Sequence, residues 1–239
     1  MGTKKFFKKT LVLIFAALAF SAFAKGKADK GQQTEQNVQQ TDEQSQATLL
    51  AEQKLQKANK EEPAITAELK SIESEKAHLE GLEHRLKSTE SLSRKILTDS
   101  HDMEVSLEEA AANIKDALRY TLIIEENDYT ELTRKTLDKL TEKGYSVYAF
   151  KNYWANDSID YQGINCNLKT SDGMIFELQF HTKESYFTKS KKTHKYYEII
   201  RSESASDEEK AEASRKQSEL FALIPVPAGV KEFSYPTTK

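Results

Sequence analysis

The clearest pattern in the chain is a pair of segments in which apolar and polar residues alternate, residues 163–170 and 174–182. Successive side chains of a strand point to opposite faces, so both segments are predicted to be strands with one apolar and one polar face. The polar positions of the two segments are, in chain order, Asn165, Asn167, Glu177, Gln179 and His181.

The short link between these strands predicts how they pair. It reads Ser-Asp-Gly, which suits a three-residue hairpin loop with its glycine in the left-handed conformation. Such a loop places Asn167 opposite Glu177 and Asn165 opposite Gln179, on one face. A two-residue loop would mix the polar and apolar faces, which argues against it.

Helical and extended patterns surround the hairpin. Helices are predicted over 106–116, 130–143, 183–202 and 206–222, and further strands over 120–124 and 145–150. This mixture predicts an α+β fold, a mixed β-sheet flanked by helices, over about residues 84–225. Residues 226–239 are predicted to be a short tail.

A helical arm is predicted before this domain, over residues 47–83. Pro63 is expected to open a new helix, because proline fits the first turn. The arm's apolar stripe consists of Ile65, Leu69, Ile72, Leu79, Leu82 and Leu86. The stripe is short for a coiled coil, so packing against the following domain is the favoured interpretation.

The amino terminus has the pattern of an export signal. Residues 1–9 carry four lysines, residues 10–20 are apolar, and small residues precede a cleavage point after Ala24. The chain is therefore predicted to be exported, periplasmic or secreted, without stable membrane association after cleavage; the alternative is an uncleaved anchor. Residues 25–46 are polar and nearly free of apolar side chains, which predicts disorder.

Composition narrows the functional classes. The chain has 239 residues and a formal net charge of -3, so charge alone gives no pull toward nucleic acid. Its one cysteine, Cys166, excludes an internal disulfide framework and a multi-cysteine zinc site. Cys166 lies on the apolar face of its strand, so we expect it to be inert.

The polar face of the hairpin is a candidate ligand site. Short amides and a carboxylate gather on it, and Tyr153, Trp154 and Tyr161 lie just upstream in the sequence. Simple solvent exposure of one face of an antiparallel sheet is the alternative.

These residues carry a resemblance to a known family. Glu-Leu-Gln-Phe-His-Thr at 177–182 resembles the Glu-x-Gln-x-Arg-Thr strand of RelA/SpoT-type (p)ppGpp synthetase domains. Other segments follow in the family's order: Arg85-Leu-Lys87, Ser91 and Lys95, then Asp116 and Arg119, then Lys151 and Tyr161-Gln-Gly-Ile-Asn165, then His194 and Tyr197. The resemblance covers about residues 84–201 and implies a nucleotidyltransferase-like fold.

The resemblance implies an activity and a set of site residues. The family transfers pyrophosphate from ATP to the ribose 3′-hydroxyl of GDP or GTP and releases AMP. The implied catalytic and Mg²⁺-binding residues are Asp116 and Glu177. The residues implied for ATP phosphates are Arg85, Lys87, Ser91, Lys95 and Arg119. Those implied for the acceptor nucleotide are Lys151, Tyr161, Asn165, Gln179, His181 and His194.

Several positions depart from the family's pattern. Arg119 follows Asp116 by three residues rather than five, and His181 stands where arginine is typical. Simpler interpretations remain open: Asp116 and Arg119 as a helical ion pair, Tyr161 as a core aromatic, and Arg85, Lys87 and His194 as solvated surface charges.

Export conflicts with the use of ATP, and two hypotheses resolve the conflict. The first is an exported pyrophosphokinase that acts as a toxin or effector inside another cell, on guanine or adenine nucleotides or on RNA ends such as tRNA. The second is a non-catalytic secreted protein that binds a nucleotide or a partner through the same fold. The arm is also a candidate surface for homo-oligomer formation.

Overall fold

The computed structural model describes residues 29–156, 160–202 and 204–238, and the predicted export signal lies outside them. The chain divides into two compact units, Met1–Thr41 and Asp42–Lys239. Of the first unit, only residues 29–41 are described, as the start of helix α1. The second unit contains the sheet and every residue of the predicted site.

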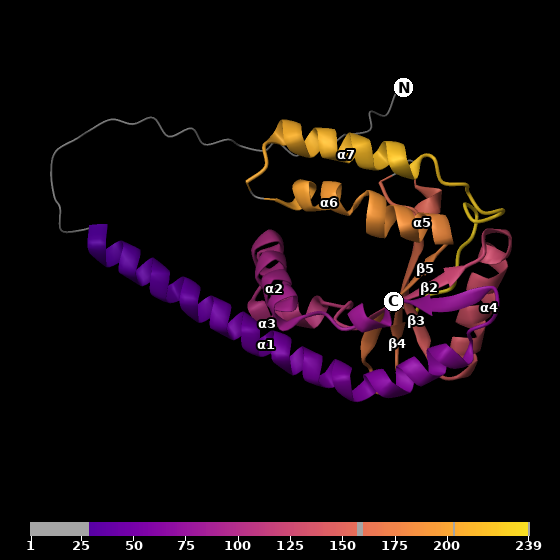
Figure 1. The fold of residues 1–239 in the computed structure, drawn as a ribbon. Coiled ribbons are helices and arrows are strands. Elements are labelled where there is room, and N and C mark those ends of the chain that lie inside the picture. Colours follow the sequence, from indigo (N-terminus) through magenta and orange to yellow (C-terminus); the bar gives the residue numbers. More distant parts are fainter. Residues whose placement is uncertain (1–28, 157–159, 203, 239) are drawn as a thin grey trace, which may run out of the picture. The chain divides into compact units, whose positions relative to one another are not determined.

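Helix α1, Asp29–Ser71, corrects two predictions (Figure 1). Residues 29–46 are helical, not disordered, because the segment is rich in glutamine and also contains glutamate, and both are good helix formers. Gln44 donates a hydrogen bond to Ser93 at 3.0 Å, so the helix also gains tertiary contacts there. Pro63 lies inside α1 and does not start a new helix. An interior proline costs a helix about 3 kcal/mol, and the packing of Ala58 and Ile65, on either side of it, into the core offsets this cost.

The predicted apolar stripe is not one helical face, because the chain reverses after α1. Ser74 N–H bonds to the carbonyl of Ala77 at 2.7 Å, and strand β1, Ala77–Glu80, follows. Gly81 then adopts φ 66°, a left-handed conformation that suits glycine, before the 3₁₀ turn η1, Leu82–His84. The spacings of seven from Ile72 to Leu79 and of three from Leu79 to Leu82 are compatible with a helix, so the sequence pattern did not reveal this reversal.

Five strands form one mixed sheet in the order β1-β2-β5-β4-β3. β2 and β5 are parallel, and the other neighbouring pairs are antiparallel. The bounds of the remaining strands are β2 Arg119–Ile124, β3 Ser146–Asn152, β4 Ile164–Lys169 and β5 Ile175–His181. The predicted mixed sheet flanked by helices is confirmed.

The predicted hairpin register is also confirmed. Asn165 pairs with Gln179, and Asn167 pairs with Glu177. Gly173 has φ 85° in the loop, and the N–H of Thr170 bonds to the carbonyl of Met174 at 2.9 Å.

The helices match the predicted segments with two exceptions. Helix α2, Thr89–Met103, was not predicted. The helix expected over 183–202 is interrupted by a π-helical turn, η4, at Thr188–Lys192. The other helices are α3 Leu107–Asn113, α4 Tyr129–Glu142, α5 Lys183–Phe187, α6 His194–Arg201 and α7 Asp207–Phe221, and short 3₁₀ turns lie at η2 Glu126–Asp128 and η3 Tyr153–Ala155.

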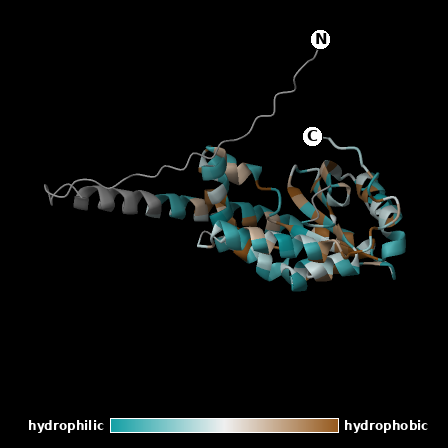
Figure 2. Ribbon diagram, turned by 90° about the horizontal axis from the view of Figure 1, so that it is seen from above, coloured by the Kyte–Doolittle hydropathy of each residue, from teal (hydrophilic) through white to brown (hydrophobic). Residues whose placement is uncertain are grey.

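The apolar face of the sheet forms the main core. Buried residues of β2, β4 and β5 pack there with Ile65 and Leu69 of α1 and with Leu137 and Leu140 of α4. Figure 2 shows hydrophobic residues concentrated in the strands, while the outer helices are largely hydrophilic. A second cluster joins Ala47 and Ala51 of α1 to α2 and α3. Because the core fills the apolar face, a ligand or catalytic site in the sheet would have to lie on its polar face.

Leu178→Ala should destabilise the domain by about 2–5 kcal/mol, because Leu178 is fully buried in the centre of the sheet and its loss leaves a cavity. Urea denaturation followed by circular dichroism measures the change. The exposed Leu223, 79% accessible, supplies the matched control Leu223→Ala, for which a change below about 0.5 kcal/mol is expected. Equal losses in the two variants would contradict this account of the core.

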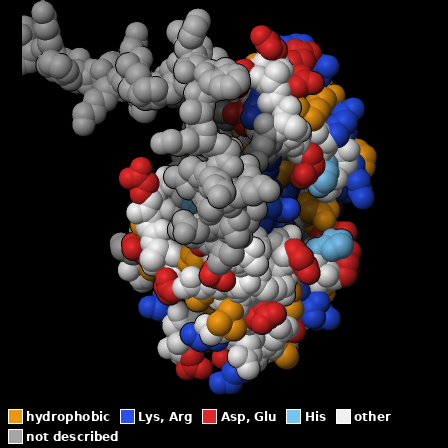
Figure 3. Space-filling model, turned by 90° about the vertical axis from the view of Figure 1, so that its left-hand side faces the viewer, with side chains coloured by type: hydrophobic (Ala, Val, Ile, Leu, Met, Phe, Trp, Pro, Cys, Tyr) orange, Lys and Arg blue, Asp and Glu red, His pale blue; other side chains and the backbone are white. Residues whose placement is uncertain are grey.

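On the face drawn in Figure 3, acidic and basic side chains of the described residues are interspersed. Within the part of the chain that the structure describes, no helix is long and apolar enough to cross a membrane.

Candidate functional site

The polar face of the central strands brings several predicted residues together. Glu177, Gln179 and His181 share that face of β5, because Phe176, Leu178 and Phe180 point into the core. Arg119 of β2 pairs with Glu177 in the parallel register, and Asn165 of β4 pairs with Gln179.

This face is not simply exposed to solvent. Gln179 is 5% exposed and His181 is fully buried. Covering residues come from α5: its Ser185 hydroxyl lies 2.9 Å from Nδ1 of His181, and the Thr182–Ser185 capping box fixes the start of the helix. The solvated-face interpretation therefore fails for the centre of the sheet.

A hydrogen-bonded network occupies the centre of the face. The hydroxyl of Tyr161 donates to Oδ1 of Asn165 at 2.8 Å and lies 2.8 Å from Nε2 of His181. The amide of Gln179 donates to the carboxylate of Glu177. Burial, and next the charge of Lys189, hold the pKa of His181 well below its ordinary value, so the imidazole is neutral near pH 7.

Tyr161 is packed within the domain instead of forming an open stacking surface. Its ring meets Tyr153 edge-on at 4.9 Å between centroids, His181 at 5.3 Å and Phe221 at 6.2 Å. Burial, and secondly the charge of Glu177, raise the pKa of its hydroxyl well above the ordinary value. Tyr161 thus orders the network, and the partly exposed Tyr153 is the neighbouring aromatic nearer to solvent.

Lys189 belongs to this face, and the sequence did not reveal it. Its amine donates to Oε1 of Gln179 at 2.5 Å and lies 3.4 Å from Nε2 of His181. Burial, and next the charge of Arg119, lower the pKa of Lys189 to about 8, against the opposing charge of Glu177. The only signal in the sequence was the group of three lysines in Lys-Ser-Lys-Lys at 189–192, which does not show which lysine turns inward.

A second group of predicted residues lies where α2 and β2 begin. Lys87 pairs with Oδ2 of Asp116 at 2.8 Å, and Lys95 pairs with Asp99 at 3.4 Å. Ser91 lies in the first turn of α2. The alternative of a helical ion pair between Asp116 and Arg119 is wrong, because α3 ends at Asn113 and Asp116 pairs with Lys87.

One carboxylate oxygen of Asp116 is paired with Lys87, and the other has no hydrogen-bond partner among the described residues. Burial favours the protonated acid, but the charges of Lys87, Lys95 and Arg119 hold the pKa of Asp116 below its ordinary value. Its other oxygen, Oδ1, is buried and has no hydrogen-bond partner in the described structure. Such an oxygen can accept a bond from a ligand or bind a cation.

Backbone pairing links the two groups. Lys87 N–H bonds to the carbonyl of Ala117 at 3.0 Å, and Glu177 N–H bonds to the carbonyl of Leu118 at 3.0 Å. Segments 85–87, 117–119 and 177–181 therefore run side by side. The charge of Arg119, in the middle segment, acts on both Asp116 and Lys189.

Three predicted residues lie outside the hydrogen-bonded network. The guanidinium of Arg85 contacts Glu62 of α1 at 2.5 Å and the carbonyl of Leu82, so its partners lie away from the polar face. Lys151 of β3 is exposed, and its register opposite Asn165 puts it at the edge of the polar face. His194 is exposed at the start of α6.

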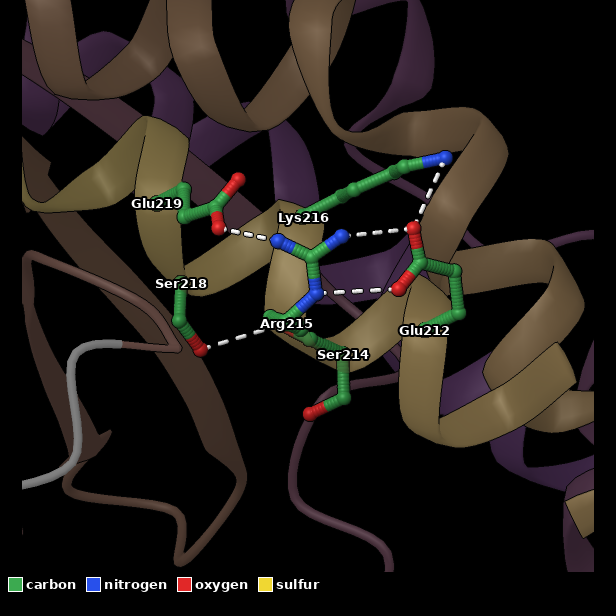
Figure 4. Close-up of polar contacts among 6 residues, drawn as sticks. All are labelled: Glu212, Ser214, Arg215, Lys216, Ser218 and Glu219. Carbon is green, nitrogen blue, oxygen red and sulfur yellow. Dashed lines mark hydrogen bonds and ion pairs between the residues drawn. The ribbon is translucent and has the colours of Figure 1, made fainter. Parts of the chain in front are cut away.

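The structure has a cavity elsewhere, of about 660 Å³, between α6 and α7. Tyr196, Ile199, Glu208 and Lys216 are among its lining residues, and no predicted site residue lines it. Figure 4 shows how α7 is braced beside it: Arg215 contacts both Glu212 and Glu219, while Lys216 lies 3.1 Å from Glu212. These are exposed ion pairs that brace the helix, and they bring no catalytic group together.

The site offers few side chains that could bind Mg²⁺. Within the described residues, no group of three or more His, Cys, Asp or Glu side chains could hold a metal. Mg²⁺ at nucleotide sites needs only one or two carboxylates, with phosphate oxygens and water completing the octahedron. The unpartnered oxygen of Asp116 fits that role, and Glu177, opposite Arg119 in register, is the second carboxylate that the resemblance implied.

Comparisons with known proteins find similarity in structure only. No protein-family model matches the chain, and no curated protein sequence matches it. The Type VI effector Tas1, crystallised with its immunity protein, is similar at 20% identity and a TM-score of 0.46, over 74% of this chain and 94% of that one.

Two further solved structures are an alarmone synthetase and a GTP pyrophosphokinase family protein. Small alarmone synthetase 1 from Bacillus subtilis, bound to its product pppGpp, shows 16% identity and a TM-score of 0.48, over 71% of this chain and 88% of that one. A GTP pyrophosphokinase family protein from Streptococcus pneumoniae shows 14% identity and a TM-score of 0.44, over 79% and 89%. These proteins are of the class that the sequence motifs resemble. At such identities and TM-scores, an activity has to be argued from the site itself.

Proposed function

We propose that this chain is an exported, Mg²⁺-dependent pyrophosphokinase of the RelA/SpoT type. It would transfer pyrophosphate from ATP to the ribose 3′-hydroxyl of GDP, GTP or a related acceptor, and act as a toxin or effector. One observation carries the proposal: Glu177 lies on a covered polar face, beside Arg119. The segment that contains Arg119 also pairs with the backbone of Lys87, whose side chain contacts Asp116.

Positive charge for the donor triphosphate comes from the start of α2 and β2. Lys87 and Lys95 both act electrostatically on Asp116, and so does Arg119. Phosphoryl-type transfer depends mostly on positioning and on neutralising the phosphate charge, which these cations would supply. Ser91 would add a hydroxyl donor at the same place.

Glu177 is the residue placed to handle the acceptor's proton. Its carboxylate would accept the proton of the 3′-hydroxyl while the oxygen attacks the β-phosphorus of ATP. The bond from that phosphorus to the oxygen bridging the α- and β-phosphates breaks, and AMP leaves with the bridging oxygen. The amide of Gln179 donates to Glu177 and so fixes the direction of its free lone pairs.

Asp116 and Glu177 are the residues that would hold Mg²⁺. When bound, the ion would neutralise charge on the phosphate oxygens and help to hold the triphosphate in place.

A non-catalytic nucleotide-binding or partner-binding protein is the second candidate. One observation favours it: both acidic side chains already have partners from the same chain, Gln179 for Glu177 and Lys87 for Asp116. A catalyst would have to give up part of these contacts when substrate binds.

One assay separates the candidates. Purified residues 25–239 are incubated with Mg²⁺, ATP labelled on its γ-phosphate, and GDP, GTP, ADP or tRNA in turn. We expect label to enter one class of acceptor, with one AMP released per product. Nucleotide binding without transfer to any acceptor would support the binding protein instead.

A further inference from the structure

Lys189 is a partly buried cation whose direct contacts are all uncharged. Its amine contacts the amide oxygen of Gln179 at 2.5 Å, the imidazole of His181 at 3.4 Å, and the ring of Tyr161 at 5.7 Å from the centroid. Among the described residues, no ion pair joins it to a carboxylate. An ammonium group withdrawn from water without an opposite charge is unfavourable, so such an arrangement is rare without a function.

The charges facing Lys189 leave an excess of positive charge. Arg119 contributes a second cation and Glu177 the one opposing carboxylate that acts on Lys189. His181 and Tyr161 are neutral near pH 7, as argued above from their burial. Two cations facing one carboxylate favour the binding of an anion at this face.

An irregular turn of the backbone directs the side chain of Lys189 toward the sheet. Residues 188–192 form a π-helical turn, closed by the Thr193 N–H on the carbonyl of Thr188 at 2.9 Å. Lys191 is exposed, and Lys192 pairs with Glu184 at 2.6 Å, so Lys189 alone of the three reaches the sheet. Single π turns occur frequently at functional sites, where they redirect a side chain.

We propose that Lys189 binds a phosphate group of the acceptor nucleotide on the polar face, beside His181. The acceptor side is favoured because Gln179, His181 and Tyr161, which surround Lys189, are the residues matched to the acceptor. Lysine binds phosphate as a compact point charge, and Lys189 remains partly exposed. The naming of an acceptor rests on the proposed function, whereas anion binding by Lys189 does not.

Calorimetric titration of the full chain with inorganic pyrophosphate tests this role. Lys189→Met should weaken binding by about 10- to 100-fold, as loss of one charge-assisted hydrogen bond predicts. Lys191→Met, two residues away and exposed, is the matched control and should bind as the native chain does. Removing the charge of Lys189 should leave the melting temperature unchanged or higher. Lys189→Gln is a second variant, and we expect the same loss of pyrophosphate affinity from it.

The outcomes separate this inference from the proposed function. Absence of pyrophosphate binding by the native chain, or native affinity in both folded Lys189 variants, would overturn the inference. Lys189-dependent binding without any transferase activity would leave the inference standing and refute the catalyst. Transfer with an unchanged acceptor KM in Lys189→Met would refute the inference alone.

Discussion

Replacing Glu177 by glutamine should abolish pyrophosphate transfer and leave the fold intact. Glutamine keeps the size of the side chain and an oxygen that can accept from Gln179, but it cannot take a proton. Loss of a positioned general base lowers the rate by about 10²- to 10⁴-fold. Release of AMP, measured against the native chain, gives the loss, and circular dichroism with urea denaturation reports on the fold.

A matched control for this substitution is Glu142→Gln. Glu142 is exposed at the end of α4, a helix that packs on the apolar face of the sheet. Its substitution should leave the transfer rate within about twofold of native, because surface changes away from a site have small effects. Native activity in Glu177→Gln, or equal losses in both variants, would remove Glu177 from the catalytic role.

Asp116→Asn should have the second largest effect, on both activity and stability. We expect transfer to fall at least about 100-fold, because the residue supplies the free oxygen and orders Lys87. Breaking the largely buried pair with Lys87 should also cost about 1–3 kcal/mol of unfolding free energy at pH 7. Urea denaturation without Mg²⁺ measures the second effect separately from the first.

The pH dependence of the unfolding free energy tests whether this loss of stability comes from the charge of Asp116. Since its pKa is lower in the folded chain, its contribution is present above the ordinary value of about 4 and is lost as the pH falls through the folded value. The native chain should therefore lose more stability on acidification than Asp116→Asn does. Asp99→Asn, in a partly exposed pair with Lys95, is the control, and parallel curves for the native chain and Asp116→Asn would contradict the assignment.

The sheet and half of the site could be predicted because their signals are local. Alternation over seven residues of β5, with a Ser-Asp-Gly turn before it, fixes the hairpin register and places Glu177 with Gln179. The same local pattern put His181 on this face, although its neutral, buried state depends on Ser185 and Lys189 from the next helix.

The remaining predictions about the site and the arm failed because they depend on distant partners or on irregular backbone. Arg85 had the spacing of a phosphate ligand, but Glu62, 23 residues earlier, holds it against α1. Lys189 was missed because a π turn has no periodic signature among neighbouring lysines. Helix α1 extends through a polar segment because contacts such as Gln46 to Glu108 at 2.6 Å support it from outside its own sequence.

A crystal structure of the protein with a non-hydrolysable ATP analogue, GDP and Mg²⁺ tests the central claim most directly, because that claim is the location of one two-nucleotide site. We expect the analogue's phosphates to contact Lys87 and Arg119, with the acceptor's 3′-hydroxyl beside Glu177 and its phosphate beside Lys189. Nucleotides bound in the cavity between α6 and α7, or none on the polar face at saturating concentrations, would contradict the account.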